Sequence, residues 1–253
     1  MRKFVRRIFI LVLFCILSFS IYNLYIIFHE YKKNKDVYKD VRKIVLKEDE
    51  KSNKDVSVEN SNNIILGSKE YTDLKARNED FLLWIYIPGT NIDYPVVKAK
   101  NNEEYLYKNF NGEANNGGCI FMDSRNQSVE DDNVVIHGHN MKDKSMFGTL
   151  SNLLKADYLN ENKKIYIYLE NKILEYEIFS VYTNNEEINP YKTNFNTDEE
   201  FNEYINNVRR KSFYNLDYVD NGTREILTLS TCTNATGEER TIVNAKLISI
   251  KEV

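Results

Sequence analysis

The sequence predicts a mainly β protein built on a closed or nearly closed barrel of about eight strands. Apolar residues make up 42% and aromatic residues 13% of the 253-residue chain, which is enough for a real core. Short runs rich in β-branched and aromatic residues recur from residue 81 onward. Few helical patterns interrupt these runs, which favours a barrel over alternating strands and helices. The predicted strands are residues 82–87, 92–98, 118–122, 133–139, 164–170, 173–183, 225–232 and 241–250.

The N-terminus contains an uncharged segment, Ile8–Phe28, of about 21 residues, close to the roughly 20 that cross a bilayer as a helix. Four basic residues precede it, and positive charge on this short flank favours a cytoplasmic N-terminus. We therefore predict that residues 1–28 form a cytoplasmic tip and a single-pass membrane anchor, with the rest of the chain outside the cytoplasm. A cleaved signal peptide is the alternative, but residues 18–20 match a cleavage site poorly and the apolar run continues past them.

A polar segment and the start of a globular domain follow the anchor. Residues 29–67 are dense in Lys, Asp, Glu and Asn, which is typical of a solvated stalk, and residues 38–48 have the pattern of a helix. The composition changes near residue 68, where a helical pattern leads into the first strand, which stops at Pro88 and Gly89. We therefore predict a polar stalk over residues 29–67 and a globular domain over residues 68–253.

Two helices are expected within this domain, and the first covers about residues 146–154. The second lies between the sixth and seventh strands, over about residues 197–213. Thr197 and Glu200 have the spacing of a capping box at its start. Its apolar residues recur at helical spacing and predict a face that packs against the barrel: Phe201, Tyr204, Ile205 and Val208.

The charge balance and the cysteines limit the possible functions. The chain has 34 basic and 38 acidic residues and a net charge of −4, so no basic field points to nucleic acid as a partner. Three cysteines are too few for a disulfide framework, and Cys15 lies inside the predicted anchor. Cys119 lies in a short apolar run, where a buried free cysteine is the ordinary explanation. Cys232 is then a free thiol or a disulfide partner of Cys119, and these alternatives exclude each other.

The seventh predicted strand ends at Cys232, beside hydroxyl side chains. Period-two alternation places Cys232 and Ser230 on one face of this strand, together with Ile226 and Thr228. The loop over residues 233–239 is long enough for the chain to reverse and pair antiparallel, which sets Arg240 near Cys232. A guanidinium near a thiol favours the thiolate or offers donors to an oxyanion. A surface arginine after an acidic loop is the alternative.

Two histidines end the fourth predicted strand, in the sequence NVVIHGHNM of residues 133–141. His137 and His139 share one face, a spacing that a zinc site could use, but no motif supplies a third ligand. There is also no nucleotide-binding glycine motif, so the sequence requires no cofactor. A cysteine, a histidine and an arginine at strand ends suit nucleophilic acyl transfer. The thiolate would attack, the imidazolium would protonate the leaving amine, and the guanidinium would hold the oxyanion.

The motif TLSTC, the arginine eight positions after its cysteine, and the earlier GHNM resemble those of the sortases, the transpeptidases of Gram-positive cell envelopes. The resemblance covers roughly residues 81–250, and the combination is more specific than any one motif. The long helix over about residues 197–213 and the helical N-terminal extension resemble class B. The resemblance therefore implies a closed mixed β-barrel with N-terminal helices and one long helix between the sixth and seventh strands.

The roles of the family transfer to matching positions of this chain. The resemblance implies that Cys232 is the nucleophile, that His139 is the acid and base, and that Arg240 stabilises the substrate and the oxyanion. It assigns Ser230 and Thr231 to substrate binding, with Ser230 lining the groove for the peptide.

The resemblance further implies cleavage of a C-terminal sorting motif of surface proteins after its Thr, a thioester on Cys232, and transfer to a peptidoglycan amine. The motif is NPxTN-like or a relative ending in TG, and a pilin lysine is the alternative acceptor. His137 has no counterpart in the family and its role is open. Two other functions also stay open: an extracytoplasmic thiol peptidase that releases its product to water, and a non-catalytic surface module in which Cys232 is buried or paired to Cys119.

Overall fold

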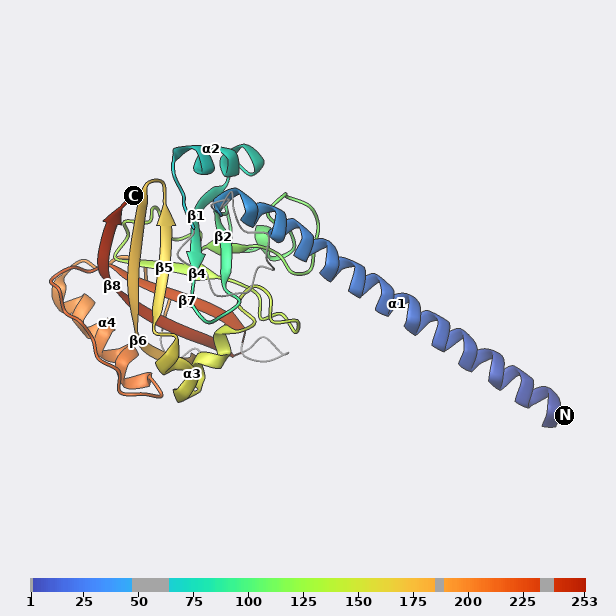
Figure 1. Cartoon of the computed structure of the whole chain (residues 1–253). Helices are drawn as coiled ribbons and strands as arrows, with labels where there is room; N and C mark the ends of the chain where they lie inside the picture. Colours follow the sequence, from blue (N-terminus) through green and yellow to red (C-terminus); the bar gives the residue numbers. More distant parts are fainter. Residues whose placement is uncertain (1, 47–63, 185–188, 233–238) are drawn as a thin grey trace.

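The computed structural model describes residues 2–46, 64–184, 189–232 and 239–253, with the backbone alone at residues 2, 3 and 232. Figure 1 shows a barrel of strands at one end of the molecule and a single long helix that extends from it to the N-terminus. The C-terminus lies on the barrel, at the end of the last strand. The N-terminal end of the long helix therefore projects away from the barrel.

The strands close into one barrel in the order β1-β2-β3-β4-β7-β8-β6-β5. Two neighbouring pairs, β2 with β3 and β4 with β7, run parallel, and the remaining pairs are antiparallel. The predicted closed mixed barrel is confirmed, and no strand end differs from the predicted one by more than two residues. The strands are β1 (Phe81–Tyr86), β2 (Asp93–Lys98), β3 (Ile120–Met122), β4 (Asn133–His137), β5 (Lys164–Leu169), β6 (Lys172–Asn184), β7 (Ile226–Cys232) and β8 (Arg240–Glu252).

The long helix between β6 and β7 is α4 (Asp198–Lys211), which lies along the outside of the barrel beside β6 (Figure 1). The backbone N–H of Glu200 donates to Oγ1 of Thr197 at 3.2 Å, so the predicted cap is present. Acidic residues in its first turn and basic residues in its last turn complement the helix dipole. The predicted apolar face is also confirmed, because the buried residues of the helix are Phe201, Tyr204, Ile205 and Val208.

Alternation along β7 builds the two faces of the barrel wall. Leu227 and Leu229 belong to the main core, and burial of each side chain contributes roughly 1.5–3 kcal/mol. On the opposite face, Ile226 packs in a second cluster with α4, and the Thr228 hydroxyl is hydrogen-bonded to a side chain of β4. Both faces of β7 are therefore packed, which fixes the strand that carries Cys232.

The predicted helix over residues 146–154 is only partly present. The structure has a 3-10 helix, η3 (Leu150–Leu154), followed by a short α-helix, α3 (Ala156–Glu161). Met146 has a positive φ of 52° and forms an isolated antiparallel bridge with Asn140. A residue in this left-handed conformation cannot begin an α-helix, so the chain turns before the helical segment starts.

The N-terminal helix α1 (Arg2–Val45) is continuous and contains an apolar stretch, of mean hydropathy 2.3, that is long enough to cross a membrane and is not buried in the protein. The helix predicted over residues 38–48 is the last part of α1. Residues 47–63 of the predicted stalk lie outside the described residues. The helix α2 (Ser68–Arg77) follows and leads into β1, as predicted.

Candidate active site

Three neighbouring strands, β4, β7 and β8, each carry a candidate residue at one end. β4 and β7 run parallel with His137 opposite Ser230. A hydrogen bond of 3.2 Å from Gly138 N to Ser230 O continues this pairing beyond β4. His139 follows this pairing two residues after His137, and Cys232 follows it two residues after Ser230. The end of β4 and the end of β7 therefore meet at the same edge of the barrel.

β7 and β8 form an antiparallel pair whose last matched residues are Cys232 and Arg240. Opposed residues in such a pair have Cα atoms about 4.5–5.5 Å apart. The hairpin predicted from the sequence is therefore present in the backbone, and its loop falls within residues that are not described, 233–238. The structure thus sets Cys232 opposite Arg240, and His139 lies just beyond the end of β4, the strand that pairs with β7.

The His139 ring is half-buried and is held by the backbone of residues 105–118. Its Nε2 atom lies 2.8 Å from the carbonyl oxygen of Leu106, and its ring centroid lies 6.2 Å from that of Tyr107. Because a carbonyl oxygen can only accept, this contact requires a hydrogen on Nε2. In the neutral ring Nδ1 is then the basic nitrogen, so Nδ1 is the atom that can exchange a proton with a reacting group.

Gly118 allows the backbone to pass close to the His139 ring. Its φ is +60°, a conformation that favours glycine. A Cβ at this position would lie 2.6 Å from the carbonyl oxygen of Tyr105, 2.7 Å from that of Leu106, and 3.1 Å from Cδ2 of His139. A larger residue at position 118 would therefore displace the carbonyl that orients His139.

His137 has a different environment. Its Nε2 atom lies 2.7 Å from Oδ2 of Asp123, a fully buried carboxylate at the end of β3. Nε and Nη2 of Arg125 donate to the same carboxylate at 2.8 and 2.6 Å. Burial alone would raise the pKa of Asp123, but the hydrogen bonds from Arg125 and His137 outweigh it and hold this pKa well below its ordinary value. His137 is therefore part of a charge cluster that ties β4 to the end of β3.

We expect Asp123→Asn to lower the free energy of unfolding by roughly 2–4 kcal/mol at pH 7, because the Arg125 guanidinium and the His137 ring lose the buried carboxylate that they share. Folding lowers the pKa of Asp123, so its contribution is complete above about pH 4 and is lost as the pH falls further. Denaturant titrations should therefore show a difference in free energy of unfolding between the wild type and Asp123→Asn that is smaller at pH 3 than at pH 7 by roughly 1 kcal/mol. Asp73→Asn, at an exposed position of α2, is the control. If Asp123→Asn lowered the free energy of unfolding equally at both pH values, the pairing of Asp123 with Arg125 and His137 would be contradicted.

Ser230 and Thr231, the predicted substrate-binding residues, are only 2% and 1% exposed. Oγ of Ser230 lies 3.0 Å from the hydroxyl of Tyr191, which belongs to the connection between β6 and β7. The Tyr191 ring in turn lies 5.3 Å from the His137 ring and 5.1 Å from Cζ of Arg125. Tyr191 therefore covers Ser230. No sequence pattern distinguishes this residue from the other tyrosines, of which the chain has 18 in all.

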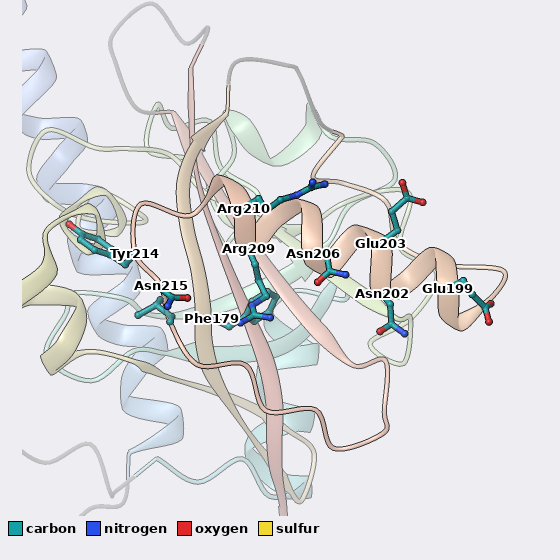
Figure 2. Close-up of a pocket in the computed structure, with 10 residues that line it drawn as sticks. Phe179, Glu199, Asn202, Glu203, Asn206, Arg209, Arg210, Tyr214 and Asn215 are labelled. Atoms are coloured by element: carbon teal, nitrogen blue, oxygen red, sulfur yellow. The ribbon is translucent and has the colours of Figure 1, made fainter.

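A hollow lies beside α4 (Figure 2). Its walls are the exposed side of α4 and the chain at residues 214–216, which leads toward β7. Acidic side chains line it near the start of the helix, and Arg209 and Arg210 line it near the end (Figure 2). Neither His139 nor Arg240 lines this hollow, so the candidate site lies at the strand ends instead.

A closed mixed barrel that brings a cysteine, a histidine and an arginine to one end is suited to thiol-based acyl transfer. Comparison with known protein families agrees with this chemistry. A family model described as the sortase domain matches residues 85–248, which span most of the barrel. The chain belongs to the sortase family and is a cysteine transpeptidase.

Three relatives described as sortase B illustrate the similarity. The chain is 31% identical to sortase B of Listeria monocytogenes over 251 residues, which are 98% of this chain and 98% of the relative. The structure of Clostridium perfringens sortase B is 39% identical, with a TM-score of 0.66 over 71% of this chain and 100% of that chain. A Staphylococcus aureus sortase B–substrate complex is 28% identical, with a TM-score of 0.73 over 87% of this chain and 99% of that chain. The chain is therefore a class B-like sortase.

Proposed function

We propose that this sortase cleaves a C-terminal sorting motif after its Thr, holds the surface protein as a thioester on Cys232, and transfers it to a peptidoglycan amine. Membership of the family supports the coarser function, a cysteine transpeptidase that anchors surface proteins to the cell wall. The observation that carries the finer proposal is the register of three neighbouring strands, which sets His139, Cys232 and Arg240 at one end of the barrel.

In the first half-reaction, the Cys232 thiolate attacks the carbonyl carbon of the Thr in the sorting motif. The guanidinium of Arg240 favours the thiolate and then stabilises the oxyanion. The imidazolium of His139 gives its proton to the leaving amine as the C–N bond breaks, which leaves a thioester and a neutral ring. Because the Leu106 carbonyl keeps a hydrogen on Nε2, the transferred proton comes from Nδ1.

In the second half-reaction, the acceptor amine attacks the thioester. The neutral His139 ring takes a proton from this amine at Nδ1, and Cys232 leaves as a thiolate. The cycle ends with the imidazolium and the thiolate restored, and with one amide bond exchanged for another.

The substrate is an extended peptide, which requires a groove rather than a deep pocket. The relative from Staphylococcus aureus was solved as a substrate complex, which supports a sorting peptide as the ligand of this chain. Ser230 and Thr231 lie buried beneath the strand ends, and the half-exposed Tyr191 covers Ser230. We therefore assign Ser230 to the floor of the groove, where it acts on the peptide through the Tyr191 hydroxyl. Thr231 lies on the opposite face of β7, so we assign it to substrate binding as a support of this floor from behind.

The same proposal places the enzyme in the cell membrane as a single-pass protein. The apolar stretch of α1 is the anchor, and the basic residues before it favour a cytoplasmic N-terminus with the barrel outside. Anchoring brings the enzyme and a substrate held at the same surface to a high effective concentration, so weak intrinsic affinity for the peptide suffices.

Incubation of the full chain in detergent micelles with NPxTN-like and TG-ending fluorogenic peptides tests this function. We expect cleavage after Thr, and when triglycine or a peptidoglycan stem peptide is added it should attack the thioester in place of water, so that a ligated product replaces the free acid. Cleavage with no ligation at high amine concentration would favour the thiol peptidase. No cleavage of any peptide, together with a Cys232 thiol that resists alkylation, would favour the surface module.

A further inference from the structure

The second half of α1 packs on the barrel instead of standing clear of it. Val41 and Val45 are 0% and 1% exposed and belong to the main core. Nη2 of Arg42 lies 2.5 Å from Oδ2 of Asp93 on β2, and Tyr38 makes an edge-to-face contact with a tyrosine of the same strand. This part of α1 begins directly after the predicted membrane segment, so the barrel lies next to that segment.

Residues on different turns of α1 contact residues 113–118. The Tyr38 hydroxyl donates to the carbonyl oxygen of Gly118 at 2.8 Å in a buried position. Burial raises the pKa of Tyr38 well above its ordinary value, so this hydroxyl stays protonated and remains a donor. Nearer the membrane segment, Nδ2 of Asn116 donates to Oε2 of Glu30 at 2.7 Å.

Residues 113–118 are in turn bonded to the chain that orients His139. The N–H of Asn115 donates to the carbonyl of Tyr107, and the N–H of Cys119 donates to the carbonyl of Tyr105, each at 2.9 Å. The carbonyl between these two is that of Leu106, which lies 2.8 Å from Nε2 of His139. The contacts therefore run without a break from α1, through residues 105–118, to the His139 ring.

We propose that the juxtamembrane part of α1 is a positioning element for the catalytic histidine, with Tyr38 as its central contact. This inference rests on the role of His139 in the proposed function. Loss of the Tyr38 hydroxyl leaves the buried Gly118 carbonyl without its donor, so residues 105–118 relax and the Leu106 carbonyl shifts. Because misplacement of a reacting group by about 1 Å can cost about 100-fold in rate, a small shift of the His139 ring is enough to slow catalysis.

Tyr38→Phe in the full chain, in detergent micelles, is the direct test. We expect kcat to fall about 5- to 20-fold while KM for the sorting peptide stays within about twofold, because only the acid–base group is displaced. Tyr71→Phe on α2 is the matched control, since it removes a hydroxyl from a ring that packs on Phe81, and kcat should stay within about twofold. Rates are expressed per molecule in which the buried Cys119 resists alkylation, so a loss of folded protein does not imitate the effect. An unchanged kcat for Tyr38→Phe would overturn the proposal.

A second measurement does not depend on activity. The chain contains three histidines, so the ring signals of the isotope-labelled protein can be assigned with His29→Gln and His137→Gln. For the neutral ring, we expect nuclear magnetic resonance to show His139 in the Nε2–H tautomer in the wild type and in a mixture of the two tautomers in Tyr38→Phe. Identical tautomer populations would overturn the proposal. If the wild type cleaves no peptide, the proposed function fails, while the tautomer comparison still decides whether α1 orients the ring.

Discussion

Replacing Cys232 with alanine is expected to reduce the cleavage of sorting peptides by at least about 1000-fold, to the background rate. The thiolate is the only group in the proposed mechanism that forms a bond to the substrate, and neither His139 nor Arg240 can substitute for it. The loss should appear in kcat, while the peptide still binds, because alanine leaves the groove intact. Cleavage assays with fluorogenic peptides measure kcat, and binding titrations of the full chain with the same peptides measure their affinity separately.

The other two cysteines provide the controls for this result. Cys15 lies in the predicted anchor, so Cys15→Ala should retain full activity. Cys119 is a free thiol that is 1% exposed, as its apolar surroundings predict, and burial raises its pKa to about 12. Iodoacetamide should therefore label Cys232 in the folded protein and leave Cys119 unlabelled. Labelling of Cys119 in preference to Cys232 would contradict the assignment of the nucleophile.

Replacing His139 with glutamine is expected to lower kcat by about 100- to 10,000-fold, because the leaving amine loses its proton donor. The Nε2 contact with Leu106 leaves Nδ1 for this transfer, and glutamine has no group that can both give and take a proton at that position. The loss should be smaller for peptides with a better leaving group, since those need less protonation. Single-turnover measurement of the acylation step gives this difference directly.

His137→Gln is the matched control, since it removes the neighbouring histidine two residues away. His137 pairs with the buried Asp123, so we expect a lower free energy of unfolding and a kcat within about threefold of the wild type. Equal losses of kcat in the two variants would show that the acid–base role is not confined to His139.

The barrel and the strand ends that carry the candidate residues could be predicted because their signals are local. A β-branched run ending at Cys232, a second ending in the histidines, and Arg240 at the start of the next run each mark a strand terminus. The capping box at Thr197 likewise marks the start of α4, and the structure contains that hydrogen bond. The helix predicted over residues 146–154 was partly wrong, because Met146 has a positive φ and pairs with Asn140, and neither feature is encoded in local helix propensity.

Contacts between distant segments could not be predicted from one sequence. The partner of His139 is the backbone carbonyl of Leu106, which no side-chain pattern identifies. The packing of α1 on the barrel is only weakly indicated by the sequence. Tyr38, Val41 and Val45 have helical spacing, but the charged residues around them are typical of a solvated stalk. The barrel surface that buries these three residues is made of segments that are distant in the sequence, so it exists only in the folded barrel.

The most direct test of the central claim is the intact mass of the protein after mixing with a sorting peptide in the absence of an acceptor amine. We predict a mass increase equal to the peptide fragment that ends in Thr, attached at Cys232 as a thioester and absent from Cys232→Ala. Triglycine should remove the added mass and yield the ligated peptide. Cleavage of the peptide with no covalent intermediate, or an adduct on a residue other than Cys232, would contradict acyl transfer through this cysteine.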